Sequence, residues 1–359
     1  MSELSPFPHG GQLAALARRS GRSAESLLDF SANINPLGMP AAARAALVKA
    51  IDDLGHYPDP DCTALRTAIG DHLGVSAECI LPGNGAEQLI WWLPRLLEAK
   101  RVLVTAPAYV DYQRAAEVWG RPLCSIQLQP DDGFALDLTR LSTQLQVGDL
   151  VWLGQPNNPT GRLINPAELK RLIASHPQVD WAIDEAFIDF VSGAESAVGW
   201  GLPNLIVIRS MTKFYALAGL RLGYAVLSPS RAAALAQLLP EWSVNSLAAA
   251  AGSALLMDPE LAAFAQRTRQ LIDSERQRLS EALAQIGLQV FDSSANYLLL
   301  RLPEAGPDAP DLASRLLHCE GIAVRVCSNY AGLDPSYLRI AVRTGPENRR
   351  LLAAMTRLL

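Results

Sequence analysis

The sequence predicts an α/β protein: a large domain built on a mostly parallel sheet, followed by a smaller α+β domain. Three observations predict this fold class. Short apolar runs alternate with amphipathic stretches from about residue 80 to residue 227, and runs that are apolar on both faces are typical of parallel strands covered by helices. Several of these runs end directly in polar or turn-forming segments. A long amphipathic stretch then separates them from a second group of strand-like segments.

The strands expected in the large domain are five apolar runs, at Arg101–Thr105, Leu150–Leu153, Trp181–Ile183, Leu205–Ile208 and Tyr224–Leu227. In open α/β sheets, ligands bind at the carboxyl ends of the strands. The polar residues that follow these runs are therefore expected to converge on one site.

The last third of the chain predicts a long helix and a second sheet. Apolar residues recur at steps of three and four through 260–287, and Gly287 then provides a natural stop. The strand-like segments that follow are Tyr297–Leu302, Ile322–Val326 and Tyr337–Val342, with a helix expected between about 311 and 318. This pattern is typical of a small α+β domain.

The length of 359 residues exceeds the size at which one hydrophobic core usually stops growing, so two domains are expected. We place residues 1–40 in an N-terminal segment that contributes to the small domain and to the active site. Residues 41–245 are expected to form the large domain, and residues 246–359 the small one.

Composition excludes several classes of function. A net charge of −5 without a basic stripe argues against a nucleic-acid binder. The five cysteines form no CxxC pair and the histidines lack ligand spacing, so we expect neither a metal site nor a disulfide framework. No apolar run approaches the roughly 20 residues that a membrane helix needs, and no signal segment is recognisable at the N-terminus. We therefore expect a soluble protein of the reducing cytoplasm.

Lys213 is one of only four lysines in the chain. It follows an apolar run and is bracketed by hydroxyls, an aromatic residue and glycines in the segment Ser210–Tyr224. A lysine amine attacks carbonyls only when burial or a nearby cation disfavours its ammonium form. The segment favours a lysine that forms a Schiff base with pyridoxal phosphate (PLP). A helix-start lysine without chemistry is the alternative that this segment alone leaves open.

PLP also needs a carboxylate beside its pyridine nitrogen, to keep that nitrogen protonated. Asp184 can supply the carboxylate, since it ends a buried apolar run. A helix N-cap is the alternative role for it. Glu185 competes for the same role, but its side chain points to the opposite side of an extended strand.

A phosphate site is expected in the segment 83–87, Gly-Asn-Gly-Ala-Glu, which precedes an apolar stretch. Glycines let the backbone approach an anion, and the N-terminus of a following helix points N–H groups at it. A plain turn before a helix has the same sequence pattern. Arg221 and the hydroxyls of Ser210 and Thr212 could add a charged clamp, and Arg221 would also lower the pKa of Lys213.

Two further side chains are candidates for cofactor contacts. Tyr109 follows the run at 101–105 and offers an aromatic face that could stack on the cofactor ring, although core packing explains it nearly as well. Asn158 lies in Asn-Asn-Pro-Thr-Gly at 157–161 and could donate to the phenolic oxygen of the cofactor. An ordinary Asn-Pro turn is the alternative for Asn158.

Four motifs together carry a specific resemblance. They are Gln155–Gly161, Asp184–Phe187, Ser210–Lys213 and Gly219–Tyr224. Their order and spacing resemble the fold-type-I PLP enzymes of the aminotransferase class I/II family. The resemblance implies a mostly parallel seven-stranded sheet in the large domain. It also implies roles for Lys213 (Schiff-base lysine), Asp184 (pyridine partner), Asn158 (phenolate partner), Tyr109 (stacking ring) and Gly85, Ala86, Ser210 and Arg221 (phosphate).

The same family resemblance implies a homodimer in which each site borrows a tyrosine from the neighbouring subunit. Tyr57, in His-Tyr-Pro-Asp-Pro at 56–60, matches that position. Arg339 matches the arginine that grips the substrate α-carboxylate, a role that suits a guanidinium fork better than an ammonium.

Further segments resemble one branch of this family, the threonine-phosphate decarboxylases of cobalamin biosynthesis, which are close to the histidinol-phosphate aminotransferases. These segments are His9–Gly11, Asp29–Gly38 and Cys327–Leu333. The resemblance implies decarboxylation of L-threonine O-3-phosphate to (R)-1-aminopropan-2-yl phosphate. Phe187 is also similar to that branch, because many transaminases carry a tyrosine there.

The branch resemblance also implies substrate contacts. Arg325 and His9 become candidates for the substrate phosphate, and Asn33 for a hydrogen bond near the carboxylate. An arginine suits a phosphate dianion through paired hydrogen bonds. An exposed strand residue is the alternative for Arg325, and a flexible tail residue is the alternative for His9.

Two other functions remain open at this stage. One is a histidinol-phosphate-type aminotransferase that uses 2-oxoglutarate. The other is a non-catalytic binding protein on the same fold. The presence of both Lys213 and Asp184 counts against the binding protein, because a degenerate binder has no chemical reason to keep both.

Overall fold

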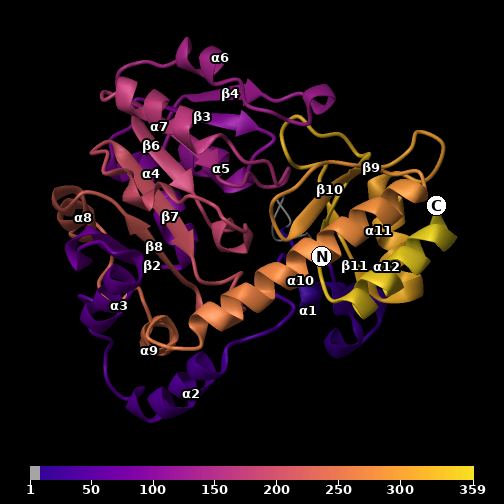
Figure 1. The fold of residues 1–359 in the computed structure, drawn as a ribbon, viewed down its shortest axis with the longest axis horizontal. Coiled ribbons are helices and arrows are strands. Elements are labelled where there is room, and N and C mark those ends of the chain that lie inside the picture. Colours follow the sequence, from indigo (N-terminus) through magenta and orange to yellow (C-terminus); the bar gives the residue numbers. More distant parts are fainter. Residues whose placement is uncertain (1–8) are drawn as a thin grey trace.

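The computed structural model describes residues 9–359, and a seven-stranded sheet forms its larger part (Figure 1). The strand order is β2-β8-β7-β6-β5-β3-β4. The strands are β2 (Ile80–Asn84), β3 (Arg101–Ala106), β4 (Leu123–Gln127), β5 (Asp149–Gly154), β6 (Asp180–Asp184), β7 (Leu205–Ser210) and β8 (Leu222–Val226). Neighbours from β4 to β7 are parallel, whereas β8 runs antiparallel to both β7 and β2. The mostly parallel sheet is thus confirmed.

Both outer strands, β2 and β4, were absent from the expected set. β2 contains Pro82 and Gly83, which are depleted in strands and tolerated best at a sheet edge. β4 is buried at Ile126 but more exposed at its other positions. β4 therefore lacks the two buried faces that made the central runs recognisable, whereas the apolar run of β2 is cut short by Pro82 and Gly83.

Helices cover the two faces of this sheet. One face packs against α4 (Gly85–Leu96), α5 (Val110–Val118) and α8 (Pro229–Ala236). The other face packs against α3 (Thr63–Leu73), α6 (Leu138–Ser142), α7 (Pro166–Ser175) and α9 (Ser246–Leu256). Successive residues of β5 alternate between these two cores: Leu150 and Trp152 belong to the first, and Val151 and Leu153 to the second. This double burial explains the continuous apolar runs in the sequence.

A long helix, α10 (Leu261–Gln285), leads from α9 to a second, four-stranded sheet (Figure 1). This sheet has the order β12-β13-β10-β9 and is antiparallel throughout. Its strands are β9 (Gln289–Val290), β10 (Tyr297–Arg301), β12 (Arg325–Val326) and β13 (Tyr337–Ala341). The helices beside it are α11 (Ala309–Arg315), which continues as a π-helical turn to Glu320, and α12 (Gly345–Leu358).

The single strand expected at Ile322–Val326 is instead two short strands. β11 (Ile322–Ala323) pairs in parallel with β1 (Leu28–Asp29), whereas β12 pairs with β13. The chain changes partners at Val324 because the N-terminal segment occupies the first half of this stretch. The expectation of one strand was wrong for this reason.

Segments on both sides of the expected domain limits pack across those limits. The backbone at Phe30 exchanges hydrogen bonds with Ala323 and Ala341, so the N-terminal segment joins the second sheet. Helix α1 (Leu13–Ser20) packs against the π-helical turn that follows α11. Helix α9 follows residue 245 but packs against α2 (Ala41–Ala50) and α3. The limits at residues 40 and 245 remain a proposal.

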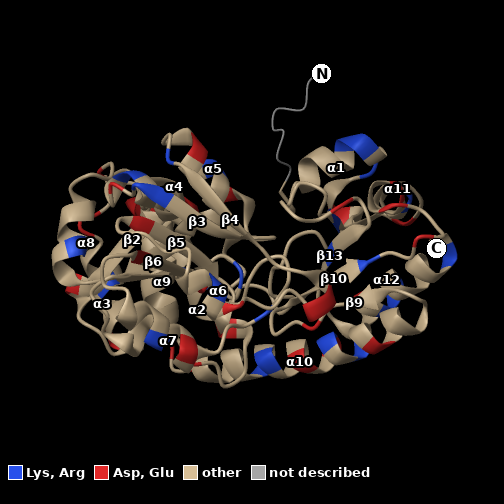
Figure 2. Ribbon diagram, turned by 90° about the horizontal axis from the view of Figure 1, so that it is seen from above, with Lys and Arg blue, Asp and Glu red and all other residues tan. Residues whose placement is uncertain are grey.

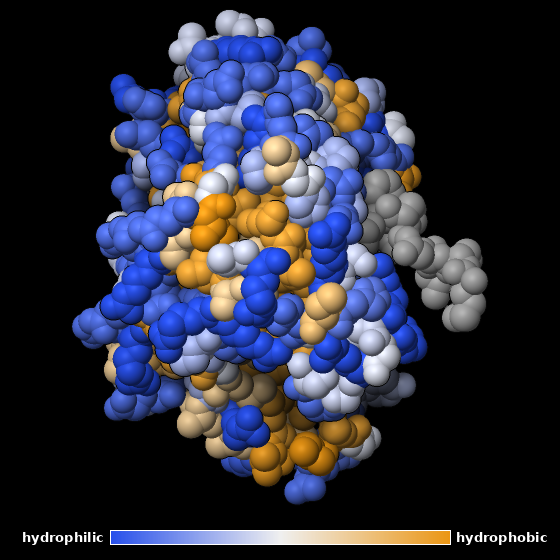
Figure 3. Space-filling view, turned by 90° about the vertical axis from the view of Figure 1, so that its right-hand side faces the viewer, coloured by the Kyte–Doolittle hydropathy of each residue, from blue (hydrophilic) through white to orange (hydrophobic). Residues whose placement is uncertain are grey.

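Charge and hydropathy are distributed unevenly over the surface. Positive and negative residues are interspersed along α10 (Figure 2), and the face seen in Figure 3 is mostly hydrophilic around a central apolar area. Within residues 9–359, no single helix is long and apolar enough to cross a membrane; α9 and α10 meet that criterion only as a pair bent by 90°.

Candidate active site

A cavity lies beyond the carboxyl ends of β5, β6 and β7, where the sequence predicted that polar residues would converge. The expected site residues that line it are Ala86, Tyr109, Asn158, Asp184, Ser210, Thr212, Lys213 and Arg221. Glu87, Tyr112 and Phe187 line it as well. One cavity therefore holds the amine, the carboxylate, the hydroxyls and the aromatic ring that were singled out separately.

Lys213 follows β7, and its Nζ lies 2.7 Å from Thr212 Oγ1. Burial and, next in size, the nearby Arg221 guanidinium lower the pKa of Lys213 to about 8, against the opposing effect of the Asp184 and Glu87 carboxylates. Both causes expected from the sequence therefore act on this amine, which is neutral in a substantial fraction of molecules near neutral pH.

This pKa gives a first testable prediction. The rate at which trinitrobenzenesulfonate modifies Lys213 in the cofactor-free protein should rise through a midpoint near pH 8, because only the neutral amine reacts. Peptide mapping against pH measures the rate, and the modification of Lys170 on α7 is followed in the same digest as an internal control. A Lys213 midpoint at the ordinary lysine value of about 10.4 would contradict the environment described here.

Asp184 ends β6 and is buried. Its Oδ2 accepts a hydrogen bond of 2.6 Å from the Tyr112 hydroxyl, and its Oδ1 accepts one of 2.9 Å from the Ala186 N–H. Burial raises the pKa of Asp184, whereas these two hydrogen bonds and the Lys213 charge oppose the rise. Donors on both oxygens stabilise the carboxylate form.

Tyr112 is a functional residue that the sequence did not suggest. Its ring stacks on Trp152 at 4.8 Å and 6°, which fixes the direction of its hydroxyl toward Asp184. The available signal was its position three residues after Tyr109, which caps the N-terminus of α5, since residues at that spacing lie on one side of a helix.

Glu185 lies on the opposite side of the sheet, as expected for the next residue in a strand. Its carboxylate accepts hydrogen bonds from Ser196 Oγ at 2.6 Å, from the Ala197 N–H at 2.7 Å and from Arg209 Nη1 at 3.0 Å. These contacts remove Glu185 as a competitor for the role of Asp184.

The N-terminus of α4 and Arg221 form a recess suited to an anion. Gly85 begins α4 with a φ of +75°, and a Cβ atom there would lie 2.8 Å from Arg221 Nη2. A Cβ atom on Gly223 would lie 2.2 Å from the Ala86 nitrogen. The hydroxyls of Ser210 and Thr212 lie 2.7 Å apart beside this recess. Free N–H groups, hydroxyls and a guanidinium are the donors that a phosphate group requires.

The donor set as a whole fits PLP. The cavity offers an amine of lowered pKa, a buried carboxylate, a helix N-terminus with a guanidinium, and an aromatic ring. Residues 9–359 contain no group of three or more His, Cys, Asp or Glu side chains that could hold a metal ion.

Asn158 is oriented by Arg339. Its Oδ1 accepts hydrogen bonds from Arg339 Nη1 at 2.6 Å and from the Tyr330 hydroxyl at 3.4 Å. The amide nitrogen Nδ2 is therefore the atom left to donate into the cavity. Arg339 is 6% exposed, and its Nη2 donates to the Ser31 carbonyl at 2.8 Å.

Arg325 and Arg339 lie side by side. They are direct partners in the antiparallel β12–β13 pair, so their side chains leave the same face of the sheet. Arg325 is 6% exposed, and its Nη2 donates to Asn329 Oδ1 at 2.7 Å. An exposed strand residue, the alternative considered for Arg325, does not describe this buried side chain.

Six predicted residues do not line the cavity: Gly85, Arg325 and Arg339, described above, and His9, Asn33 and Tyr57. His9 Nε2 lies 3.2 Å from Asp111 Oδ2, and the His9 ring lies 5.9 Å from that of Tyr109, so His9 borders the aromatic side of the site. Asn33 is 3% exposed, and its Oδ1 has no hydrogen-bond partner within residues 9–359. Tyr57 is 80% exposed and stacks on Trp242 at 4.7 Å.

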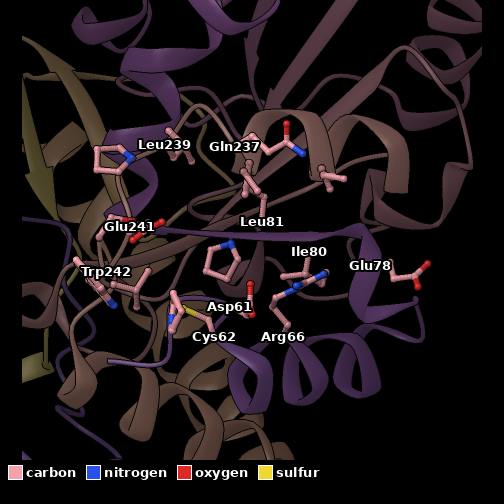
Figure 4. A pocket seen from close by; sticks show the side chains of 18 of the residues that line it. Asp61, Cys62, Arg66, Glu78, Ile80, Leu81, Gln237, Leu239, Glu241 and Trp242 are labelled. Atoms are coloured by element: carbon pink, nitrogen blue, oxygen red, sulfur yellow. The ribbon is translucent and has the colours of Figure 1, made fainter. Parts of the chain in front are cut away.

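A larger cavity of about 770 Å³ lies between β2, α3 and α8 (Figure 4). Its lining includes Arg66, Glu78, Gln237 and Trp242. None of the lining residues is a lysine or a predicted site residue. Size alone therefore does not identify the site, because the chemistry required of it is gathered in the smaller cavity.

Comparison with known proteins places the chain in a family. The model of "Aminotransferase class I and II" matches residues 25–355. The threonine-phosphate decarboxylase of Salmonella typhimurium is 40% identical over 98% of this chain and 96% of that protein. An adenosylcobalamin biosynthesis bifunctional protein of Leptospira interrogans is 36% identical over 97% of this chain, which spans only 40% of that longer protein. Histidinol-phosphate aminotransferase 2 of Ralstonia nicotianae is 33% identical over 98% of this chain and 94% of that protein.

Solved structures show the same fold. The L-threonine-O-3-phosphate decarboxylase from Porphyromonas gingivalis superposes with a TM-score of 0.81 at 27% identity, covering 91% of this chain and 98% of that one. The histidinol-phosphate aminotransferase from Sinorhizobium meliloti, solved in complex with pyridoxal-5'-phosphate, has a TM-score of 0.84 at 26% identity, covering 100% of this chain and 98% of that one.

Proposed function

This chain belongs to the aminotransferase class I and II family, and on that premise we propose that it is a PLP-dependent lyase that decarboxylates L-threonine O-3-phosphate. The product is (R)-1-aminopropan-2-yl phosphate, a precursor in cobalamin biosynthesis. A relative with this activity in its name matches the chain over nearly the full length of both proteins, at 40% identity.

The observation that carries the proposal is the pair of buried arginines on one face of β12 and β13. Two guanidinium groups side by side repel each other unless anionic groups lie between or beside them. Arg325 and Arg339 each have an amide oxygen as partner, from Asn329 and Asn158, and neither forms a salt bridge within residues 9–359. A substrate with both a carboxylate and a phosphate dianion supplies the missing negative charge.

We assign the cofactor contacts to the residues that line the cavity. Lys213 holds the aldehyde carbon, Asp184 the pyridine nitrogen, Asn158 the phenolic oxygen, and Tyr109 one face of the ring. The phosphate is held by Gly85 and Ala86 at the start of α4, with Ser210, Thr212 and Arg221. When bound, PLP withdraws electrons from the bond that breaks at the substrate α-carbon.

The reaction breaks the bond between the α-carbon and the carboxylate carbon, releases carbon dioxide and adds a proton to the α-carbon. We assign delivery of that proton to Lys213 Nζ, the basic group in the cavity, whose pKa is about 8. Arg339 and Arg325 orient the substrate through its anionic groups, and we assign further substrate contacts to His9 and Asn33. Only a bond held perpendicular to the cofactor ring breaks readily, so this orientation decides which bond is lost.

Phe187 favours decarboxylation over transamination. It lines the cavity but has no hydroxyl, and its ring packs edge-on against Tyr297 at 5.0 Å. The Tyr297 hydroxyl donates instead to the Asn157 carbonyl at 2.8 Å. Asn158 is therefore left as the main donor to the phenolic oxygen, which resembles the decarboxylase branch.

Two assays test the activity. The protein loaded with PLP is incubated with L-threonine O-3-phosphate alone, and separately with histidinol phosphate plus 2-oxoglutarate. We expect release of carbon dioxide in the first assay without any oxo acid. Glutamate formation in the second assay, with no carbon dioxide in the first, would instead assign the histidinol-phosphate aminotransferase activity that relatives at 33% identity carry in their names.

Arg325→Ala provides a second prediction. Loss of a charged hydrogen-bonding group costs about 1.5–3 kcal/mol, so we expect KM for the phosphorylated substrate to rise by roughly 10- to 150-fold. PLP affinity should stay unchanged, since Arg325 does not line the cofactor cavity. Steady-state kinetics measure the effect, with Arg315→Ala on the exposed face of α11 as the matched control. Equal KM values for both variants would remove Arg325 from substrate binding.

The assembly is proposed to be a homodimer. Tyr57 and Trp242 are 80% and 45% exposed, and Val48, Ile51 and Leu54 near α2 are also exposed apolar residues. A second copy would bury them, and Tyr57 would then reach the neighbouring site, where Arg221 is exposed. We also propose a cytoplasmic location, consistent with five cysteines that form no disulfide.

A further inference from the structure

Glu87 lines the cofactor cavity, yet none of the contacts assigned above uses its side chain. It lies in the first turn of α4, and both of its carboxylate oxygens are occupied. Oε1 accepts a hydrogen bond of 2.6 Å from Trp91 Nε1, and Oε2 accepts one of 2.8 Å from the Tyr109 hydroxyl. A partly buried carboxylate with two aromatic donors is a specific arrangement rather than a solvated surface charge.

The Tyr109 ring has few other contacts that fix its orientation. Its neighbours are Tyr112, edge-on at 5.5 Å, and His9, tilted at 5.9 Å. Both are ring contacts, which tolerate rotation and sliding far more than a hydrogen bond does. The Tyr109 hydroxyl donates to Glu87 Oε2 at 2.8 Å, and the Asp111 carboxylate is a second hydrogen-bonding neighbour of this hydroxyl.

Glu87 is itself held in place. Trp91, its second donor, lies one helical turn further along α4, and the Arg114 guanidinium from α5 lies 5.1 Å from the Trp91 ring. The Trp119 indole donates to the Trp91 carbonyl at 2.6 Å. These contacts connect α4 and α5, so Tyr109, at the start of α5, is fixed relative to the phosphate recess at the start of α4.

The charges around Glu87 come from three elements. The pKa of Glu87 is raised, first by burial and then by the Asp111 carboxylate on α5, whereas the hydrogen bonds from Tyr109 and Trp91 and the charge of Lys213 after β7 oppose the rise. The Glu87 carboxylate in turn raises the pKa of Lys213. The side chain therefore contacts the aromatic face of the site and also acts on its amine.

We propose that Glu87 is a positioning residue that holds the Tyr109 ring over the cofactor through its hydrogen bond. This inference rests on the cofactor part of the proposed function and not on the identity of the substrate. It assigns Glu87 no contact with substrate and no proton transfer. Its effect is to keep Tyr109 in one orientation before the cofactor binds, which lowers the ordering cost of binding.

A double-mutant cycle tests this inference. The variants Glu87→Ala, Tyr109→Phe and the combined variant are compared by the dissociation constant of PLP, measured by quenching of tryptophan fluorescence. Each single change removes the same hydrogen bond, so we expect each to weaken binding by about tenfold. The dissociation constant of PLP in the combined variant should exceed the larger of the two single-variant values by no more than about twofold, because the shared hydrogen bond is lost only once.

Two further variants sharpen the result. Glu87→Gln keeps an acceptor for one aromatic donor, so on a logarithmic scale it should recover at least half of the PLP affinity that Glu87→Ala loses. If Glu87→Ala does not fold, Glu87→Gln takes its place in the cycle. Glu117→Ala, on the exposed side of α5, is the matched control and should bind PLP as the wild type does. The visible circular dichroism of bound PLP should weaken in both Glu87→Ala and Tyr109→Phe, because both free the ring that imposes asymmetry.

The outcomes separate this inference from the proposed function. Additive losses in the combined variant, or PLP affinity unchanged in Glu87→Ala, would overturn the positioning role while leaving the enzyme assignment intact. Failure of the wild type to bind PLP would overturn the proposed function itself.

Discussion

Lys213→Ala is expected to lose all covalent attachment of PLP and all measurable turnover. Lys213 is the one lysine that lines the cavity with Asp184 and the phosphate recess, and burial lowers its pKa to about 8. Removal of a nucleophile that also moves the proton leaves no other amine within reach of the bound aldehyde. Borohydride reduction followed by intact-mass measurement detects the attachment.

The control for this variant is Lys170→Ala, which removes an amine from α7, a helix on the face of the sheet opposite to α4 and α5. It should retain both the covalent adduct and turnover. A reduced adduct of one cofactor per chain in Lys213→Ala would show that another lysine is the anchor and would remove the basis of the site.

Arg339→Ala is expected to produce the second largest loss. The buried guanidinium donates to Asn158, which lines the cavity, and to the Ser31 carbonyl. Loss of a buried, hydrogen-bonded charge that contacts a carboxylate costs about 2–5 kcal/mol, or roughly 30- to 5,000-fold in substrate affinity. Substrate titration monitored by the absorbance of bound PLP measures the change.

Two further variants show whether the loss of substrate affinity in Arg339→Ala comes from the lost guanidinium. Arg339→Lys should recover only part of the loss, because an ammonium cannot bond Asn158, Ser31 and a carboxylate in the geometry of a planar fork. Arg357→Ala, on the exposed side of α12, should leave substrate affinity unchanged. Unaltered affinity in Arg339→Ala would place the carboxylate elsewhere.

Much of the site could be predicted from the sequence because its residues directly follow apolar strands. Asp184 ends β6 and Lys213 follows β7, and parallel strands bring their carboxyl ends together. Gly85 was recognisable because a glycine before an apolar stretch marks a helix start where a backbone must approach a ligand.

Tyr112 and Glu87 were not predicted as functional because their importance comes from partners on other elements. Tyr112 is 72 residues from Asp184 in sequence, and Glu87 is 22 residues from Tyr109. Each looks in the sequence like an ordinary residue of an amphipathic helix. Only the packing of α4 and α5 on the sheet brings them to the cavity.

The role of Arg325 depended on register, which the sequence does not specify. Arg325 pairs with Arg339 because the chain stops pairing with β1 after Ala323 and begins to pair with β13 at Arg325. A shift of one residue would turn its side chain to the other face of the sheet. Tyr57 lies outside the cavity of its own chain, so its predicted contribution requires a second subunit.

A crystal structure of this protein with PLP would show directly whether Lys213 and Asp184 hold one cofactor ring. We expect electron density that is continuous from Lys213 Nζ to the cofactor, with the pyridine nitrogen at hydrogen-bond distance from Asp184 and the phosphate at the start of α4. PLP bound in the larger cavity beside Trp242, or a ring that contacts only one of Asp184 and Lys213, would refute this site.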